Sequence, residues 1–275
     1  MNPSFRKINS AGEHRSYLLY IPESYDPARA TPLVFCLHGF VEEPWHVMTM
    51  SGWNRLADRF GFIAVYPRGT GFPLRWLTYG RWVRRESSDR DVQFISDLID
   101  KLSAEFNLDQ KRIYINGMSN GGGMTFLLSC RLSERIAAFG SVAGAYSVPW
   151  DLCRPTRAVP AIIFHGDADP IVPYGGGSGS LSGMVLPEIP GWVKNLAERN
   201  GCQAQPAEQP AAGRAKAITY PGGDCGADVV FYTISGGGHT WPGGRPMMKW
   251  LTGTTTRDIE ATALMWKFFE AHPLP

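Results

Sequence analysis

The sequence lacks three features that would each have pointed to a particular class of protein. No apolar run approaches the roughly 18 residues that a membrane-spanning helix needs, so we expect no contact with a membrane. The 27 lysines and arginines nearly balance the 25 aspartates and glutamates, and a net charge of +2 predicts no nucleic-acid partner. No Cys/His cluster has zinc spacing, so we predict no metal site.

Cysteine is also scarce, with five residues in the chain. Cys36 lies in an apolar run and is expected to be a buried thiol. Cys202 and Cys225 lie in polar, glycine-rich segments, N-G-C and G-G-D-C-G, where exported proteins place disulfides. We predict that these two pair, a loop closure that stabilises a fold by on the order of 3 kcal/mol. Cys130 and Cys153 are a second candidate pair.

What the sequence has is enough apolar side chains for a full core, at 44% of 275 residues. Short apolar runs alternate with helical patterns, which predicts an α/β fold in one domain over residues 1–275. The sheet is expected to be mostly parallel, with helices on both faces and its first strand at an edge. The predicted strands are residues 14–21, 33–37, 61–66, 113–115, 137–144, 160–165 and 229–234, and the predicted helices are residues 53–60, 92–106, 124–132, 189–200 and 259–271.

Residues 112–123, R-I-Y-I-N-G-M-S-N-G-G-G, have the pattern of a nucleophile elbow. A short strand runs into a tight turn with Ser119 at its tip, and an apolar helix follows. Gly117 and Gly121 lie two residues before and after the serine, where the neighbouring backbone passes too close for a side chain. The pattern therefore predicts that Ser119 is a catalytic nucleophile.

A serine nucleophile needs a histidine base and a carboxylate to orient that base. In folds with such an elbow the three follow the chain order Ser, acid, His. Three histidines follow the serine. His272 lies near the end of the last helix, and His165 directly precedes the candidate acids. This elimination leaves His239, in a glycine-rich loop after the strand at residues 229–234.

The acid is expected after the strand at residues 160–165, because open α/β sheets place ligands at the carboxyl ends of their strands. Asp167 and Asp169 both lie there, in G-D-A-D-P. We select Asp169 and keep Asp167 as the runner-up. Whichever carboxylate is not catalytic is expected to order the turn.

The oxyanion hole is expected to use two backbone N–H groups. One comes from the loop after an early central strand, where His38-Gly39-Phe40 follows residues 33–37, and Phe40 N–H is the candidate. The second is Asn120 N–H, directly after the nucleophile. His38 itself is expected to order its own loop.

Substrate-binding residues are harder to select from the sequence. Residues 68–90 form a predicted long connection with six arginines. Trp76 and Trp82 in this connection, and Trp241 beside the base, are candidates for contact with a ferulate or sugar ring, with internal packing as the alternative. The glycine-rich residues 175–183 are either a gate over the site or a loose insertion.

Three motifs together resemble the polyhydroxybutyrate-depolymerase-like esterases, a group that includes the feruloyl and acetylxylan esterases of carbohydrate esterase family 1. They are G-M-S-N-G-G, H-G-D-A-D-P-I-V-P-Y and G-G-G-H-T-W-P-G, in that chain order. The resemblance implies an α/β-hydrolase fold without a large cap domain, with Ser119, Asp169 and His239 as nucleophile, acid and base. It also implies that Cys202 pairs with Cys225 and that the protein is secreted or periplasmic.

The motifs and the resemblance together lead us to expect a serine carboxylic-ester hydrolase that works through an acyl-enzyme and needs no cofactor. Feruloyl or acetyl esters of plant polysaccharide are the preferred substrates. A polyhydroxyalkanoate depolymerase, or an oligomer hydrolase of that kind, is the alternative. A non-catalytic polysaccharide-binding protein on the same scaffold is the alternative from another class.

Overall fold

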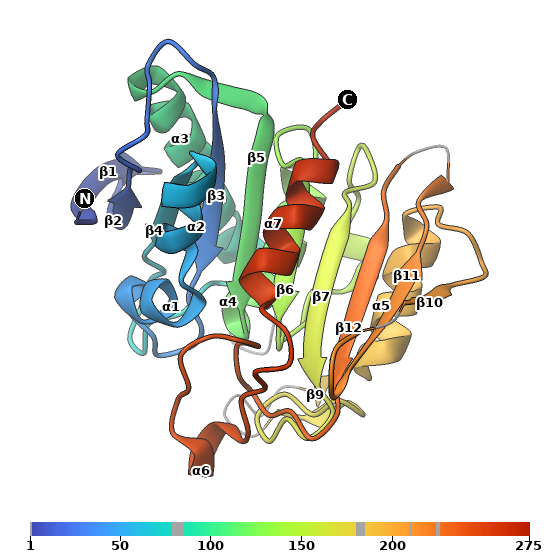
Figure 1. The fold of residues 1–275 in the computed structure, drawn as a ribbon. Helices are drawn as coiled ribbons and strands as arrows, with labels where there is room; N and C mark the ends of the chain where they lie inside the picture. Colours follow the sequence, from blue (N-terminus) through green and yellow to red (C-terminus); the bar gives the residue numbers. More distant parts are fainter. Residues whose placement is uncertain (1, 79–84, 180–184, 210, 224–225) are drawn as a thin grey trace.

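A computed structural model describes residues 2–78, 85–179, 185–209, 211–223 and 226–275 (Figure 1). In this part of the chain a ten-stranded sheet has the order β1-β2-β4-β3-β5-β6-β7-β12-β11-β10. The six inner strands, from β4 to β12, are parallel, and the two at each end are antiparallel. The strands are β1 (Ser4–Ser10), β2 (Glu13–Tyr20), β3 (Thr31–Leu37), β4 (Ile63–Pro67), β5 (Leu108–Met118), β6 (Ala138–Val142), β7 (Ala161–Gly166), β10 (Ala207–Gln209), β11 (Ala215–Tyr220) and β12 (Val229–Ile234).

Helices cover both faces of the sheet, as the uninterrupted apolar strands predict. Leu33, Phe35 and Leu37 of β3 pack into one core cluster, whereas Val34 and Cys36 point into the other. Figure 1 shows the two helical layers on opposite sides of the strands. The first layer contains α3 (Arg85–Glu105), α4 (Asn120–Arg131) and α5 (Ile189–Arg199), and the second contains α1 (Pro44–Ser51), α2 (Trp53–Phe60) and α7 (Ala261–Ala271).

Two remaining pairs of elements are short. The strand β8 (Gly177–Ser178), in the glycine-rich segment, pairs with β9 (Val185–Leu186), which follows that segment, and the two form their own small sheet. The 3-10 helix η1 (Trp150–Leu152) follows β6, and α6 (Lys249–Thr252) follows the loop after β12.

The parallel core agrees with the sequence prediction, and the differences lie at its margins. The predicted edge strand at residues 14–21 is β2, the second strand, because β1 pairs outside it through a tight turn at Ala11 and Gly12. The prediction that this strand starts the sheet was therefore wrong. The alternation of β1 is too polar to stand out, since most of its side chains are exposed or half-buried.

Two helices begin earlier than predicted. The helix expected at residues 92–106 begins at Arg85, so part of the predicted 68–90 connection is helical. Its first turns carry few apolar side chains and gave no periodic signal. The elbow helix begins at Asn120 rather than at residue 124, directly after Ser119, because three consecutive glycines masked its start. This places the Asn120 N–H in the first turn of α4, where backbone donors have no partner within the helix.

A disulfide joins Cys130, in the last turn of α4, to Cys153, with their Cα atoms 4.9 Å apart. This confirms the second candidate pair. Cys225 lies outside the described residues, so the Cys202–Cys225 pairing stays a prediction. Cys36 is buried, as expected, and burial raises the pKa of its thiol far above the usual range. No helix in the described ranges is long and apolar enough to span a membrane.

Candidate active site

Ser119 sits at a strained corner between β5 and α4. Its backbone angles, φ 57° and ψ −120°, lie outside the regions that side-chain-bearing residues favour, a conformation that costs on the order of 1–3 kcal/mol. The corner is held by backbone hydrogen bonds. Ser119 N–H donates to Val142 O at 2.9 Å, and Ser119 O accepts from Gly123 N–H at 2.9 Å and from Ala145 N–H at 3.0 Å. Strain that the surroundings enforce in this way is typical of functional positions.

The glycines on either side of the corner are required by close packing. A Cβ on Gly117 would lie 2.7 Å from the carbonyl carbon of Gly121. A Cβ on Gly121 would lie 2.5 Å from the carbonyl oxygens of both Leu37 and His38. Side chains do not approach backbone atoms so closely, so the two glycines bring the serine turn against the end of β3. This confirms the reason given from the sequence for small residues at these positions.

Asp169 and His239 meet at the carboxyl ends of β7 and β12, two parallel neighbours in the sheet. The Asp169 Oδ2 and His239 Nδ1 atoms are 2.8 Å apart, and the residues are 6% and 5% exposed. Asp169 Oδ1 accepts from the N–H groups of Ile171 and Val172, each at 2.8 Å. Every oxygen of this buried carboxylate therefore has a donor, and its plane is fixed toward the imidazole.

A second histidine also faces the carboxylate. His165 Nε2 donates to Val172 O at 3.0 Å and lies 3.4 Å from Asp169 Oδ2. Burial alone would raise the pKa of Asp169, but the charge of His239 and the hydrogen bonds from His165 and His239 outweigh it. The net effect holds the pKa of Asp169 well below its usual range, so the group stays a carboxylate at any working pH. The sequence reasoning had only excluded His165 as the base and had missed this contact.

Asp167, the runner-up for the acid, bonds the backbone of the His239 loop rather than the imidazole. Its Oδ1 accepts from Gly236 N–H at 2.6 Å, so it orders the loop that carries His239. The residue is exposed. This agrees with the expectation that the second carboxylate orders a turn. On the far side of the same loop, His239 N–H donates to Thr252 O at 2.6 Å.

The loop after β3 leaves one backbone donor available. Gly39 N–H donates to Glu42 Oε2 at 2.8 Å, and Val41 N–H donates to Leu74 O at 2.8 Å. Among the described residues, the Phe40 N–H has no hydrogen-bond partner. The loop also lies against the nucleophile, because a Cβ built on Gly39 would lie 3.5 Å from Ser119 Cβ. In the described part of the chain the N–H of Asn120, the residue after Ser119, also has no hydrogen-bond partner, so this loop and the first turn of α4 each keep one free donor.

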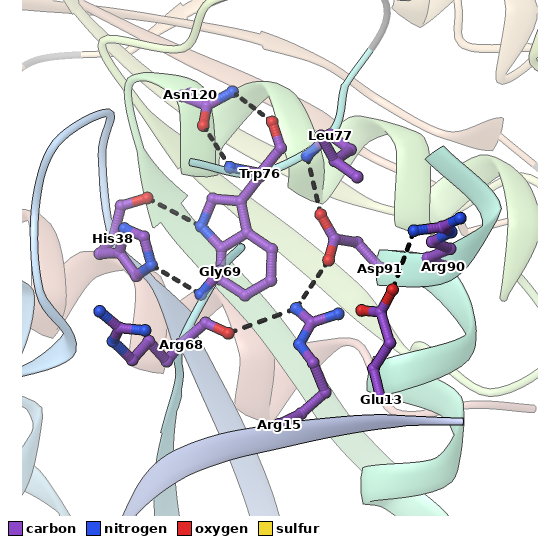
Figure 2. A network of polar contacts seen from close by, with 10 residues as sticks. All are labelled: Glu13, Arg15, His38, Arg68, Gly69, Trp76, Leu77, Arg90, Asp91 and Asn120. Atoms are coloured by element: carbon purple, nitrogen blue, oxygen red, sulfur yellow. Dashed lines mark hydrogen bonds and ion pairs between the residues drawn. The ribbon is translucent and has the colours of Figure 1, made fainter. Parts of the chain in front are cut away.

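His38 holds this loop as a neutral side chain. Its Nε2 accepts from Gly69 N–H at 2.9 Å (Figure 2). The ring proton is therefore on Nδ1, which donates to Gly39 O at 2.7 Å. The residue is fully buried, and this burial lowers its pKa from 6.5 to about 4. Both contacts agree with the prediction that His38 orders its own loop.

The predicted aromatic contacts with substrate are not supported by the structure. Trp76 and Trp241 are each 1% exposed. Their indole N–H groups donate to His38 O at 3.0 Å and to Thr262 Oγ1 at 2.9 Å. A ring enclosed in this way offers no face to a substrate, so the prediction of substrate contact is corrected to internal packing for both. Trp82 lies outside the described residues.

An exposed tryptophan that the sequence reasoning missed lies beside the site instead. A groove of about 220 Å³ is lined by Trp45, Met50 and Met247 together with Glu42 and Arg245. Trp45 is 53% exposed. Glu42 accepts from the N–H of Gly39, the residue that lies against Ser119, so the groove borders the loop beside the nucleophile. No motif in the sequence singles out Trp45, and the sequence alone gives no sign of its neighbour Met247.

The described residues contain no group of three or more His, Cys, Asp or Glu side chains that could hold a metal ion. The ionisable groups that converge at the carboxyl edge of the sheet are instead a carboxylate and imidazoles. This arrangement suits nucleophilic and acid–base chemistry by the side chains themselves.

The known proteins that resemble this chain in sequence are described as esterases. The family model described as "Esterase PHB depolymerase" matches residues 15–148. A putative esterase, NocK, of Nocardia uniformis subsp. tsuyamanensis is 30% identical over 272 residues, with 92% of this chain and 78% of that protein covered. Feruloyl esterase C of Emericella nidulans is 26% identical over 226 residues, with 81% and 76% covered.

A bifunctional acetylxylan esterase/xylanase of Neocallimastix patriciarum is 28% identical over 234 residues, and the chain spans 31% of its length. Among solved structures, an acetyl xylan esterase from Aspergillus awamori has a TM-score of 0.66 at 14% identity, with 98% of this chain and 99% of that chain covered. A ferulic acid esterase of Anaeromyces mucronatus has a TM-score of 0.58 at 14% identity, with 87% and 85% covered. At such identities these two structures establish the fold alone.

The lowered pKa of His38 predicts how the stability of the protein changes with pH. The unfolded chain takes up a proton near pH 6.5, whereas the folded protein does so only near pH 4. Between these values the unfolded state binds more protons, so the free energy of unfolding falls as the pH is lowered, by about 3 kcal/mol at most from this group. The free energy of unfolding, measured by urea unfolding at several pH values between 7 and 4.5, should fall less steeply with decreasing pH for His38→Gln than for the wild type.

The matched control is His14→Gln, which changes an exposed histidine of β2 and should leave the slope as in the wild type. An NMR titration in which the His38 ring takes up its proton near pH 6.5 would contradict the account.

Proposed function

Because the chain belongs to the polyhydroxybutyrate-depolymerase-like esterases and is a carboxylic ester hydrolase with the α/β-hydrolase fold, we propose that it cleaves esters with Ser119, His239 and Asp169. The observation that carries the proposal is the 2.8 Å contact between the buried Asp169 carboxylate and His239 Nδ1, at the same sheet edge as the strained serine. We also propose that residues 1–275 form one catalytic domain.

The proposed reaction begins with attack of Ser119 Oγ on the ester carbonyl. Asp169 keeps the imidazole proton on Nδ1 of His239, so Nε2 is the atom that takes the serine proton. The same Nε2–H then protonates the leaving alcohol. In the second half of the reaction His239 removes a proton from water, the resulting hydroxide attacks the acyl-enzyme, and the acid product leaves as Ser119 regains its proton.

The oxyanion of both tetrahedral intermediates is proposed to bind the N–H groups of Phe40 and Asn120. Removal of one such donor in other serine hydrolases costs about 10²–10³ in kcat, so their placement matters greatly for the rate. The positive end of the α4 dipole adds to the stabilisation, since Asn120 is the first residue of this 12-residue helix.

For the substrate, we propose feruloyl (hydroxycinnamoyl) or acetyl esters of plant polysaccharide. Relatives with these activities in their names support the choice. In place of the two buried tryptophans, Trp45 is the proposed contact for an aromatic acyl group, because its half-exposed indole lines the groove next to the oxyanion loop. An indole face and methionine side chains suit a flat, weakly polar ring.

Hydroxybutyrate esters are a second candidate, as polymer or oligomer. The description of the matching family model names this polymer, and the apolar lining of the groove also suits an aliphatic hydroxyacyl chain. The Cys130–Cys153 disulfide supports a further proposal, that the protein works in an oxidising compartment, secreted or periplasmic, because structural disulfides persist mainly there.

The triad is tested by two isosteric changes at neighbouring carboxylates. Asp169→Asn should keep the bonds from Ile171 and Val172 but donate an amide proton to His239 Nδ1. The proton then moves to Nε2, which can no longer accept from the serine, and kcat on p-nitrophenyl acetate should fall by about 10⁴. Asp167→Asn keeps its Oδ1 acceptor for Gly236 and should stay within about threefold of the wild type.

Ser119→Ala is assayed beside these two variants and should be inactive on methyl ferulate, p-nitrophenyl acetate and a hydroxybutyrate trimer. Full activity of Ser119→Ala, or a larger loss in Asp167→Asn than in Asp169→Asn, would show that the proposed triad is wrong.

The groove is tested with Trp45→Ala on two substrates. Loss of an aromatic contact of about 0.5–1.5 kcal/mol should lower kcat/KM on methyl ferulate by roughly 2- to 12-fold and leave ethyl acetate, which has no ring, within about twofold. Trp250→Ala is the control, because Trp250 is 82% exposed and does not line the groove. Equal effects of Trp45→Ala on both esters would place ferulate elsewhere.

A further inference from the structure

Trp76 connects the two proposed oxyanion donors. Its side chain reaches the loop that carries one of them, because the indole Nε1–H donates to His38 O at 3.0 Å. His38 lies two residues before Phe40 in the same loop. The ring also packs against the imidazole, with the two centroids 5.1 Å apart. Figure 2 shows the indole between the His38 loop and the segment that follows Trp76.

The main chain of Trp76 bonds the side chain of Asn120, the residue whose backbone N–H is the other proposed donor. Trp76 N–H donates to Asn120 Oδ1 at 2.7 Å, and Asn120 Nδ2 donates back to Trp76 O at 3.2 Å (Figure 2). Asn120 Nδ2 also donates to Thr78 Oγ1 at 3.3 Å. A side-chain amide bonded on both its oxygen and its nitrogen cannot rotate without losing at least two hydrogen bonds. The two contacts of Trp76 with Asn120 therefore fix the first residue of α4, whose N–H is the second proposed donor.

A buried ion pair holds the segment that follows Trp76. Leu77 N–H donates to Asp91 Oδ2 at 2.7 Å, and Asp91 Oδ1 accepts from Arg15 Nη2 at 2.7 Å. Asp91 is fully buried and Arg15 is 6% exposed. The guanidinium also lies 4.1 Å from the centre of the Phe94 ring. A carboxylate in this position is tolerated only because both oxygens have donors, so the backbone of Leu77 has little freedom to move.

The ion pair is fixed to the rest of the fold at several points. Arg15 comes from β2 and Asp91 from α3, and Arg15 Nη2 also donates to Arg68 O at 3.3 Å. The next residue, Gly69, bonds His38 through its N–H. The buried Arg15–Asp91 pair therefore bonds the segment of Trp76 through Leu77 N–H, and it bonds Arg68, the neighbour of the residue that holds His38.

From these contacts we propose that Trp76 is a positioning residue that fixes the Phe40 and Asn120 donors relative to each other, with Arg15 and Asp91 as its buried anchor. The inference rests on the proposed oxyanion hole. Two donors 80 residues apart in the sequence must converge on one oxygen, and an error of about 1 Å in such geometry can cost 10²-fold in rate. Trp76 bonds the His38 loop and Asn120 of α4 at once and so links the positions of the two donors.

The test variant is Trp76→Phe, which keeps a buried aromatic ring and the main-chain bonds to Asn120 but removes the donor to His38 O and part of the ring volume. On p-nitrophenyl acetate, kcat should fall by about 10- to 100-fold while KM changes by less than about threefold, because the donors act mainly on the transition state. A trifluoromethyl ketone forms a hemiketal oxyanion on the catalytic serine. Its inhibition constant should rise by the same factor as kcat falls.

Trp53→Phe is the matched control. It removes another buried indole hydrogen bond, from Trp53 Nε1 to Asn116 Oδ1 at 2.9 Å, in the core on the opposite face of the sheet. Both variants should lose thermal stability, but Trp53→Phe should keep kcat and the inhibition constant within about twofold of the wild type. Equal losses of kcat in the two variants would mean that the effect is only destabilisation and would overturn the proposal.

Asn120→Ala provides an independent arm should Trp76→Phe fail to fold. It keeps the backbone donor and removes the side-chain amide that bonds Trp76, and it should also lower kcat by about 10- to 100-fold with little change in KM. Wild-type kcat in this variant, or in a folded Trp76→Phe, would refute the positioning role. Ser119→Ala separates the two claims: if that variant keeps its activity, the proposed function fails instead.

Discussion

The close approach of the serine turn to the end of β3 is the constraint on which the rest of the site depends. A Cβ on Gly121 would lie 2.5 Å from the carbonyl oxygens of Leu37 and His38, so only glycine allows this contact. The contact brings the first residue of α4 beside the loop that carries Phe40. It also forces Ser119 into a strained conformation, with φ at 57°. The proposed oxyanion hole depends on this approach, because its two backbone donors come from distant parts of the chain.

The parallel sheet supplies the other half of the site. The carboxyl ends of β7 and β12 are neighbours, and each delivers one member of the Asp169–His239 pair. Burial would favour a protonated carboxyl group, but the charge of His239 and the hydrogen bonds from His165 and His239 keep the pKa of Asp169 low and hold it ionised. The N–H groups of Ile171 and Val172 bond its other oxygen. A fixed carboxylate sets the tautomer of His239, and this tautomer is what the proposed reaction needs. The fold thus determines the protonation state through placement of backbone and side-chain donors.

Local patterns predicted the parts of the molecule that depend on local chemistry. The elbow glycines, the placement of Asp169 and His239 directly after two buried strands, and the apolar inner strands were all readable, since each follows from a few adjacent residues. The burial of Trp76 and Trp241 was not readable, because it depends on partners such as His38 and Thr262 that are distant in the sequence. The same holds for Arg15 and Asp91, 76 residues apart. The polar β1 and β10 were missed because strand pairing at the sheet margins, rather than hydrophobic patterning, defines them. β11 was missed although its side chains alternate between buried and more exposed positions, because the buried ones are small alanines and a threonine.

The central claim is that Ser119 is the single activated nucleophile of this esterase. The most direct measurement is reaction with a fluorophosphonate, followed by intact-mass analysis and peptide mapping. The account predicts one adduct per chain, on Ser119, with loss of ester hydrolysis in proportion to labelling. It also predicts no adduct in Ser119→Ala and strongly slowed labelling in Asp169→Asn. An adduct on a different residue, or ester hydrolysis that persists after complete labelling of Ser119, would contradict the account.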